Sequence, residues 1–206
     1  MADYIFGITG PTGAGKSTVS DMFRKRGIYV ADADEASRRV TEKGSQCLDE
    51  IRNAFGGGIL NECGALDREK LGTIVFGDRK KLEILTRITH KYIKEYIADE
   101  IDRSGAAIAA IDGAVIIGSP VYDMCRCMVV VTADKDIRLK RIMRRDGIDG
   151  GAAVNRINSQ PEDCEYIKYA DYVIENNGSK IQGEQIEHIC NQIKSEAKNK
   201  SKTTPL

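Results

Sequence analysis

The chain lacks an excess of charge of either sign. Its 206 residues include 31 Lys and Arg against 31 Asp and Glu, so the formal net charge at pH 7 is zero. Proteins that bind nucleic acid through bulk charge need a basic excess. The sequence therefore predicts no nucleic-acid partner, although local basic clusters can still hold phosphate groups.

Long apolar runs are also missing. The longest, at 106–118, is interrupted by Asp112 and is shorter than the roughly 20 residues that cross a bilayer. The N-terminus enters a β-prone run at once, without a basic start or a cleavable apolar segment. We therefore expect a cytoplasmic protein without a membrane partner.

The cysteine and histidine spacing of a zinc site is absent. None of the six cysteines forms a C-x-x-C pair, and His90 and His188 lie far from any cysteine pair. Thiols stay reduced in the cytoplasm. We expect neither a zinc site nor a disulfide framework.

The chain does contain a phosphate loop. Residues 10–17 read Gly-Pro-Thr-Gly-Ala-Gly-Lys-Ser and fit G-x-x-x-x-G-K-[ST] at every fixed position. A β-prone run at 4–9 precedes the motif and a helix-forming run at 18–25 follows it, as the motif requires. A plain Gly-rich turn has no need for the Lys-Ser pair, so the motif predicts nucleotide binding.

Each residue type in the loop contributes to holding a nucleotide. The glycines let successive N–H groups turn toward one anion, and the following helix adds its positive end. Lys16 brings a cation to the outer phosphates, and Ser17 offers a hydroxyl to Mg²⁺. We expect the loop to bind ATP with Mg²⁺ through Gly13, Ala14, Gly15, Lys16, Ser17 and Thr18.

Strand-like runs alternate with helical patterns along the chain. This alternation predicts an α/β fold of the P-loop NTPase type, with three layers (α/β/α) and a five-stranded parallel sheet. Ligands bind at the carboxyl ends of such strands, where the phosphate loop, Asp32–Asp34 and Asp112 fall. The strand-like runs are 4–9, 28–32, 107–112, 127–132 and 171–175.

Two insertions interrupt this core. The first, 34–103, is too long for one crossover helix and is predicted to form a helical domain that binds the acceptor. The second, 146–160, is predicted to be a lid. The nucleotide-binding core then consists of 1–33, 104–145 and 161–206, and its tail from residue 194 is expected to fray.

Asp34 is the candidate general base. Phosphoryl transfer to a hydroxyl needs a carboxylate that accepts the proton of the attacking oxygen. Asp34 is expected one strand over from the phosphate loop, at the same sheet edge. It is also placed to cap the next helix, and the two roles are compatible.

Residues 136–146 predict an arginine-rich helix. Arg138, Arg141 and Arg145 share one stripe, which is either a solvated face balanced by nearby aspartates or a lid that clamps the triphosphate. The phosphate loop favours the lid. Three apolar residues are expected to form the buried stripe: Leu139, Ile142 and Met143.

Four further residues remain open between a structural and a functional role. Asp112 either holds Mg²⁺ as the acid of a Walker B strand or belongs to an Asp-Gly turn. His90 is either a packed helical histidine or a substrate contact. Asp67 and Arg68 are either a capping pair or a contact to an anionic substrate.

Signatures of a molecular switch are missing. No N-K-x-D motif occurs, and the one D-x-x-G, at 102–105, ends a predicted helix rather than a strand. A GTPase is therefore disfavoured.

At these motifs the chain resembles the dephospho-CoA kinase family, over nearly its whole length. The phosphate loop is common to many kinases, whereas the later elements in this order and spacing are more specific. The shared pieces are Thr9-Gly10, 13–18, Asp32-Ala33-Asp34, 64–68, Val75-Phe76, His90, Lys140-Arg141, Arg145-Asp146, Gln160, 170–174 and Asn176.

The resemblance implies an activity and roles for individual residues. The activity is transfer of the γ-phosphoryl group of ATP to the ribose 3′-hydroxyl of dephospho-CoA, which gives CoA and ADP in the last step of CoA synthesis. Asp34 would be the base, with Lys16, Arg141 and Arg145 completing the catalytic set, and Asn176 would lie near the adenine. Apart from the resemblance, we expect acceptor contacts from Thr9, Asp34, Arg68 and His90. We expect Mg²⁺ to be held by Ser17 and, where Asp112 acts as a Walker B acid, by Asp112.

The chain departs from the family pattern in three places. Lys91 stands where the family has Pro, and Ala114–Gly118 stands where it has Pro-Leu-Leu-Phe-Glu. In the phosphate loop, Pro11 and Thr12 stand where the family more often has Gly-Ile. Two alternatives follow: a kinase of another small acceptor such as a nucleoside or nucleotide, or a nucleotide-binding regulator that has lost the reaction. We expect ATP and dephospho-CoA as partners of a monomer or weak homo-oligomer.

Overall fold

A computed structural model describes residues 2–178 and 181–201. The chain divides into two compact units, the first formed by Met1–Asp32 with Ile101–Leu206 and the second by Ala33–Glu100. None of the helices in the described ranges is long and apolar enough to span a membrane.

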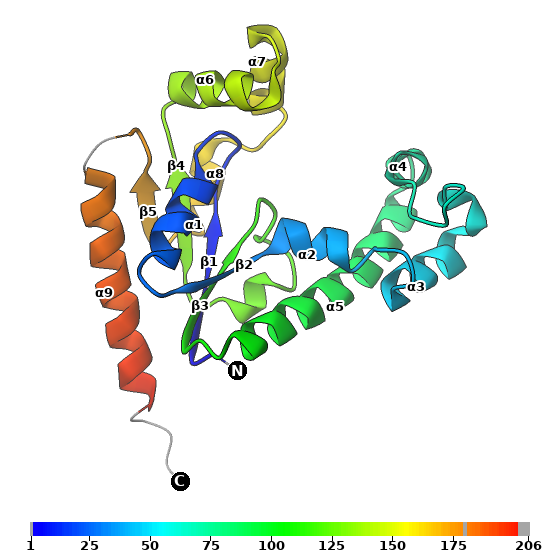
Figure 1. Cartoon of the computed structure of the whole chain (residues 1–206). Helices are drawn as coiled ribbons and strands as arrows, with labels where there is room; N and C mark the ends of the chain where they lie inside the picture. The colour runs from blue at the N-terminus through cyan, green and yellow to red at the C-terminus, as the bar shows by residue number, and fades with distance from the viewer. Residues whose placement is uncertain (1, 179–180, 202–206) are drawn as a thin grey trace. The chain divides into compact units, whose positions relative to one another are not determined.

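The first unit is built on a five-stranded parallel sheet (Figure 1). All its pairings are parallel, in the order β2-β3-β1-β4-β5. The predicted P-loop α/β fold is thereby confirmed. The strands are β1 (Tyr4–Thr9), β2 (Tyr29–Asp32), β3 (Ile108–Asp112), β4 (Met128–Thr132) and β5 (Tyr172–Glu175).

Strands β1 and β4 are mainly apolar and are buried along their whole length. Every residue of β1 and of β4 is buried. Continuous apolar runs of this kind are typical of parallel strands that are covered on both faces. The central position of β1 brings the phosphate loop that follows it to the middle of the carboxyl edge of the sheet.

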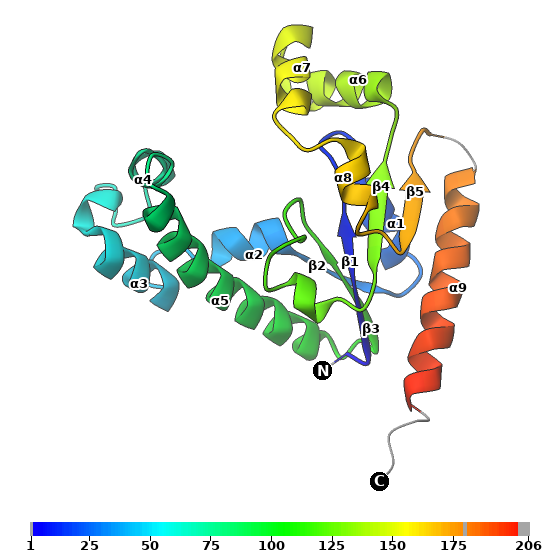
Figure 2. The same ribbon diagram turned by 180° about the vertical axis from the view of Figure 1, so that it is seen from behind.

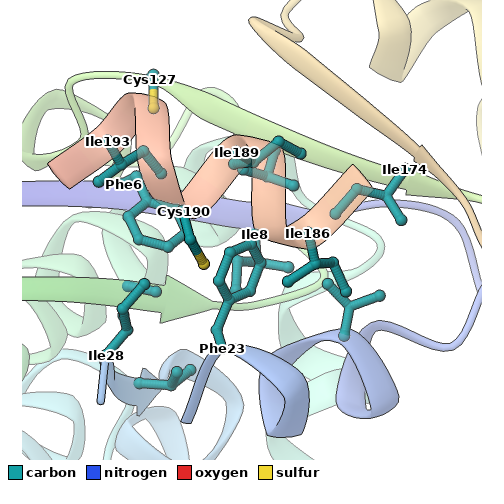
Figure 3. Packing of buried hydrophobic residues seen from close by; sticks show 14 of the residues in the cluster. Phe6, Ile8, Phe23, Ile28, Cys127, Ile174, Ile186, Ile189, Cys190 and Ile193 are labelled. Atoms are coloured by element: carbon teal, nitrogen blue, oxygen red, sulfur yellow. The ribbon is translucent and has the colours of Figure 1, made fainter. Parts of the chain in front are cut away.

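Helices α1 (Lys16–Arg24) and α9 (Ile181–Ser201) cover one face of the sheet. Phe6 of β1 packs edge-to-face on Phe23 of α1, with ring centroids 5.2 Å apart, and Ile186 of α9 packs into the same cluster (Figure 3). This cluster fixes α1, and therefore the start of α1 next to the phosphate loop, against the sheet.

The segment after β3 and helix α8 (Asp163–Ile167) lie over the opposite face (Figure 2). Helix η2 (Tyr122–Met124) lies against β1, and α8 lies against β4. Two tyrosines join these elements, since the rings of Tyr122 and Tyr169 meet edge-to-face at 6.3 Å.

Helices α6 (Lys135–Asp146) and α7 (Gly150–Asn158) pack on each other. Ile142 is fully buried against Ala153 and Ile157, with Leu139 beside them. Met143 is exposed, so its predicted place in the buried stripe was wrong. One side of α6 faces α7 and another faces the phosphate loop. The side chain of Met143, next to Ile142, therefore stays open to solvent.

The second unit is helical and has its own core. Helix α5 begins there and ends in the first unit. The core consists of residues such as Ile51, Ile59 and Leu71. The elements are α2 (Ala33–Arg39), α3 (Gln46–Phe55), η1 (Gly57–Ile59), α4 (Arg68–Val75) and α5 (Arg79–Ser104).

Side-chain caps set two of the helix starts in this unit. Ser45 accepts a hydrogen bond from Leu48 N at the start of α3, and Asp67 accepts one from Lys70 N at the start of α4. The capping interpretation of Asp67 is confirmed. Asp34 lies inside the first turn of α2 rather than at its cap, because the helix begins directly after β2.

The C-terminal segment is more regular than the sequence predicted. Helix α9 continues to Ser201, so the expected fraying from residue 194 was wrong for residues 194–201. Residues 202–206 lie outside the described part of the chain.

Candidate active site

Three glycines give the phosphate loop its shape. Gly10, Gly13 and Gly15 have φ angles of 148°, 77° and 87°, which other residues rarely adopt. Their neighbours also leave no room for a side chain: a Cβ on Gly10 would meet the carbonyl of Val131, and one on Gly13 would lie 2.8 Å from the carbonyl oxygen of Arg138. The loop is therefore fixed by both backbone angle and space.

Helix α1 presents its N-terminus at the end of the loop. Gly15 is its N-cap and supplies no side-chain hydrogen bond, so the N–H groups of the first turn suit an anion. Ser17 and Thr18 are exposed in this turn. Lys16 Nζ donates to the carbonyl of Gly10 at 2.9 Å, which holds the ammonium group across the loop.

Arg141 and Asn176 bind the carbonyl groups of the loop. Arg141 Nη1 donates to Ala14 O at 3.1 Å, and Asn176 Nδ2 donates to Ala14 O at 2.8 Å and to Gly15 O at 3.3 Å. In a planar trans peptide the C=O and the following N–H point in opposite directions. These bonds therefore turn the N–H groups of Gly15 and Lys16 the other way, as an anion site requires.

Asn176 supports the loop from a buried position. It is 3% exposed, and Arg141 Nη2 donates to its backbone carbonyl oxygen at 2.9 Å. The structure thus places this predicted ATP-binding residue under the loop. A contact with the adenine remains a prediction.

The three arginines expected on one stripe of α6 have three different surroundings. Arg138 is buried, with Nε donating to Thr12 O at 2.9 Å and Nη1 to Asp163 Oδ1 at 2.6 Å. Arg141 contacts the loop. Arg145 donates to Asp146 Oδ1 at 2.7 Å, and this bond raises the pKa of Arg145. A single arginine face, whether solvated or clamping a triphosphate, does not describe α6.

Two carboxylates lie side by side at the carboxyl edge of the sheet. Asp32 ends β2 and Asp112 ends β3, and the two are register partners in the parallel pairing. Asp112 Oδ2 also accepts a hydrogen bond from Ser20 Oγ of α1 at 2.7 Å. This bond brings the acid of β3 against the helix that begins at the phosphate loop.

The oxygen donors near the loop fit Mg²⁺. This ion prefers hard oxygen ligands and is usually held by one or two carboxylates together with waters and substrate phosphates. Within the described residues no group of three or more His, Cys, Asp or Glu could hold a metal alone. The carboxylates of Asp32 and Asp112 and the hydroxyl of Ser17 suit a metal that arrives with a nucleotide.

The predicted base and two predicted acceptor contacts belong to the second unit. Asp34 is exposed in the first turn of α2. Arg68 Nη2 donates to Thr41 Oγ1 at 2.9 Å, and burial lowers the pKa of the half-buried His90. The three residues lie in the helical unit, and their action on an acceptor is a prediction.

Thr9 is different from the other predicted acceptor contacts. It ends β1 in the first unit and is fully buried, so its side chain does not reach solvent. Its Oγ1 has no hydrogen-bond partner among the described residues. The structure gives this side chain a place in the core directly before the loop rather than in an open site.

A cavity of about 460 Å³ opens in the first unit beside the loop. Gln160 lines it and also accepts a hydrogen bond from Thr12 N at 2.7 Å. The segment that departs from the expected family pattern supplies much of its apolar wall. The lining residues are Ala114, Val115, Ile117, Ser159, Gln160, Pro161, Glu165, Tyr166 and Tyr169.

The sequence did not predict which residues hold the loop. Arg138 and Gln160 bind the backbone of Thr12, whereas Arg138 was expected in a clamp on the triphosphate and Gln160 was known only as a residue shared with the family. The three-residue step from Arg138 to Arg141 placed both on one side of α6, but it did not place Arg138 against the loop.

A phosphate loop between a buried central strand and a helix, with an arginine-bearing helix against it, defines a P-loop kinase. Residues 4–182 match the family model described as CoaE, dephospho-CoA kinase. A Listeria innocua protein named dephospho-CoA kinase is 41% identical over 176 residues, which cover 84% of this chain and 88% of that protein. The chain belongs to the dephospho-CoA kinase family.

Solved structures agree with this assignment. The dephospho-CoA kinase from Campylobacter jejuni matches with a TM-score of 0.63 and 27% identity, over 94% of this chain and 98% of its own. The Thermus thermophilus protein TT1252 matches with a TM-score of 0.77 and 28% identity, over 95% of this chain and 98% of its own.

Proposed function

We propose that the protein is a dephospho-CoA kinase that transfers the γ-phosphoryl group of ATP to the ribose 3′-hydroxyl of dephospho-CoA. The products are CoA and ADP, and the reaction is the last step of CoA biosynthesis. Family membership over residues 4–182 supports the acceptor. The observation that carries the chemistry is the loop itself. Arg141 and Asn176 bind its Ala14 carbonyl group, so the amide that follows points the other way, as the binding of a phosphate requires.

The donor side of the reaction is assigned to the first unit. The amides of the loop and the N-terminus of α1 would bind the phosphates of ATP, and Lys16 would neutralise charge on the outer phosphate. Arg141 already contacts the loop and would stabilise the charge that develops on transfer. Arg145 would contribute in the same way only after its hydrogen bond to Asp146 is replaced by one to a phosphate oxygen.

The acceptor contacts are assigned to residues of the second unit. Asp34 would accept the proton of the attacking 3′-hydroxyl, and Arg68 and His90 would contact the acceptor. The cavity beside the loop in the first unit is lined mainly by apolar and aromatic groups, together with Ser159, Gln160 and Glu165, and by no Lys or Arg. This lining suits a neutral group such as a nucleobase better than a diphosphate. Residues 146–160 would serve as the lid.

Mg²⁺ would be held by Ser17 and Asp112, with Asp32 beside them, and would supply positive charge that neutralises the phosphates of ATP. We also propose a cytoplasmic location and a monomeric or weakly associating protein, as expected from the sequence.

Product formation tests the activity directly. The purified protein is incubated with Mg·ATP and dephospho-CoA, and CoA is quantified by mass spectrometry, with Lys16→Ala as the inactive control. We expect CoA only with the wild-type protein, and none when EDTA is present. ATP binding without CoA formation at high enzyme concentration would contradict the proposal.

A panel of other acceptors completes this experiment. Nucleosides and nucleotides replace dephospho-CoA at equal concentration, and ADP release is followed. Faster turnover of one of them would indicate a kinase of another acceptor, whereas ATP binding with no turnover of any acceptor would indicate a regulator.

A further inference from the structure

Arg138 is the only buried charged residue in the part of the chain that the structure describes, with 4% of its surface exposed. A buried guanidinium is tolerated only where its N–H groups have partners. Here Nη1 donates to the half-exposed Asp163 at 2.6 Å, and Nε donates to the carbonyl of Thr12 at 2.9 Å. One side chain on α6 therefore joins α8 to the phosphate loop.

Both backbone groups of Thr12 are bound by side chains. Its carbonyl accepts from Arg138 Nε, and its N–H donates to Gln160 Oε1 at 2.7 Å. Because C=O and the next N–H point in opposite directions across a trans peptide, the Arg138 bond directs the N–H of Gly13 away from α6. The Thr12 amide itself is already occupied.

Arg138 also limits Gly13 through its own backbone. A Cβ on Gly13 would lie 2.8 Å from the carbonyl oxygen of Arg138, and Gly13 keeps a φ of 77°. The backbone of α6 and the guanidinium thus contact adjacent residues of the loop. The guanidinium and the backbone of Arg138 therefore both determine the orientation of the Thr12–Gly13 peptide.

We propose that Arg138 is a positioning residue for the phosphoryl donor: it orients the Thr12–Gly13 peptide, together with Gln160, so that the loop is shaped for phosphate before ATP arrives. Arg138 does not touch the nucleotide. The inference rests on the donor site of the proposed function and not on the identity of the acceptor.

A purely structural role is the competing explanation, because the Arg138–Asp163 pair by itself joins α6 to α8. Lysine separates the two roles. Lysine carries a methylene, Cε, where arginine carries Nε, so Arg138→Lys removes the donor to Thr12 and keeps a cation for Asp163. Asp163→Asn does the converse, since it removes the charge partner and leaves the bond to Thr12.

The test measures ATP affinity and thermal stability of both variants. The dissociation constant of Mg·ATP is determined by calorimetry without acceptor, and KM and kcat are determined with dephospho-CoA. We expect Arg138→Lys to weaken ATP binding about tenfold, the scale of one hydrogen bond to a charged group. The KM for dephospho-CoA and the melting temperature should stay close to wild type.

The matched variants are expected to behave differently. Asp163→Asn should lower the melting temperature while ATP affinity stays within about twofold. Arg144→Lys, an exposed change on the same helix, should change neither. The inference would be overturned if Arg138→Lys lowers the melting temperature but binds ATP as the wild type does.

A second variant covers the case in which Arg138→Lys does not fold. Gln160→Ala removes the partner of the Thr12 N–H and acts on the same residue of the loop. Weakened ATP binding supports the inference, and unchanged binding contradicts it. These ATP measurements contain no acceptor, so they keep their meaning even if the protein fails to make CoA.

Discussion

Asp34 is the residue whose change should separate binding from chemistry. Its carboxylate lies in the first turn of α2, outside the phosphate loop. We predict that Asp34→Asn lowers kcat by roughly 10²–10⁴-fold, the usual contribution of a general base, and leaves the affinity for Mg·ATP nearly unchanged. Steady-state kinetics and calorimetry check the two parts.

Lys16→Ala is the comparison for this prediction, because Lys16 lies in the loop and should be needed for both phosphate binding and transfer. A normal kcat for Asp34→Asn would remove Asp34 from the catalytic role, and an equal loss of ATP affinity would assign it to donor binding.

The cysteines should differ in reactivity according to their burial. Cys63 and Cys164 are exposed, whereas burial raises the pKa of Cys47 to about 11 and that of Cys127 to about 11. Only the thiolate is nucleophilic. We predict that iodoacetamide at pH 7.5 modifies Cys63 and Cys164 first, which peptide mapping by mass spectrometry checks.

The same pKa shifts make stability depend on pH. An ordinary thiol pKa of 9.0 in the unfolded chain lies below the raised value for Cys47, so the unfolded chain loses its proton first. The free energy of unfolding should therefore fall as the pH rises from about 9 toward 11. Urea titrations should show a weaker fall for Cys47→Ala, and an identical pH dependence would contradict this assignment.

At the scale of elements, the strand–loop–helix unit is the most tightly constrained. Gly15 has a φ of 87°, and a Cβ there would collide with Nδ2 of Asn176 and lie 3.3 Å from Nη1 of Arg141. We predict that Gly15→Ala costs about 1–3 kcal/mol of stability and abolishes measurable ATP binding. Thermal unfolding and calorimetry check both effects.

Gly178→Ala is a matched control for this change. Gly178 also has a positive φ, of 82°, but no atom lies within 4 Å of the Cβ position. The Gly178→Ala variant should lose less stability than Gly15→Ala and should bind ATP with the affinity of the wild type. Equal effects of the two changes would mean that the strained angle alone, and not the crowding by Asn176 and Arg141, explains the result.

At the scale of the whole molecule, the second unit has a core separate from the cluster under the sheet. Ile51 is fully buried in that core. We predict that Ile51→Ala destabilises the helical unit by about 2–5 kcal/mol, raises the KM for dephospho-CoA and leaves the dissociation constant of Mg·ATP unchanged. Calorimetry and acceptor kinetics check the separation.

Ile186→Ala is the reciprocal change, because Ile186 of α9 packs in the cluster under the sheet. It should weaken ATP binding, since that cluster holds α1 in place. If Ile51→Ala also lost ATP affinity, ATP binding and acceptor binding would not depend on separate cores, and the prediction would be contradicted.

The sequence by itself determined the elements whose signals are local. Five apolar runs between helical patterns predicted the parallel sheet, and the spacing of Gly10, Gly13, Gly15, Lys16 and Ser17 predicted the phosphate loop, because strand formation and glycine-dependent turns depend on neighbouring residues. The order of the later motifs was enough to indicate the family.

Only the tertiary structure decided which side chains hold the loop. Arg138 and Arg141 come from a helix more than a hundred residues away, and Asn176 comes from the end of β5. A helical pattern tells which residues share a stripe. It does not tell that the guanidinium of Arg138 is buried under the loop while that of Arg145 pairs with Asp146. Burial and hydrogen-bond partners depend on packing between distant segments, which is why Met143 was misplaced and Arg138 was expected on the nucleotide rather than on the loop.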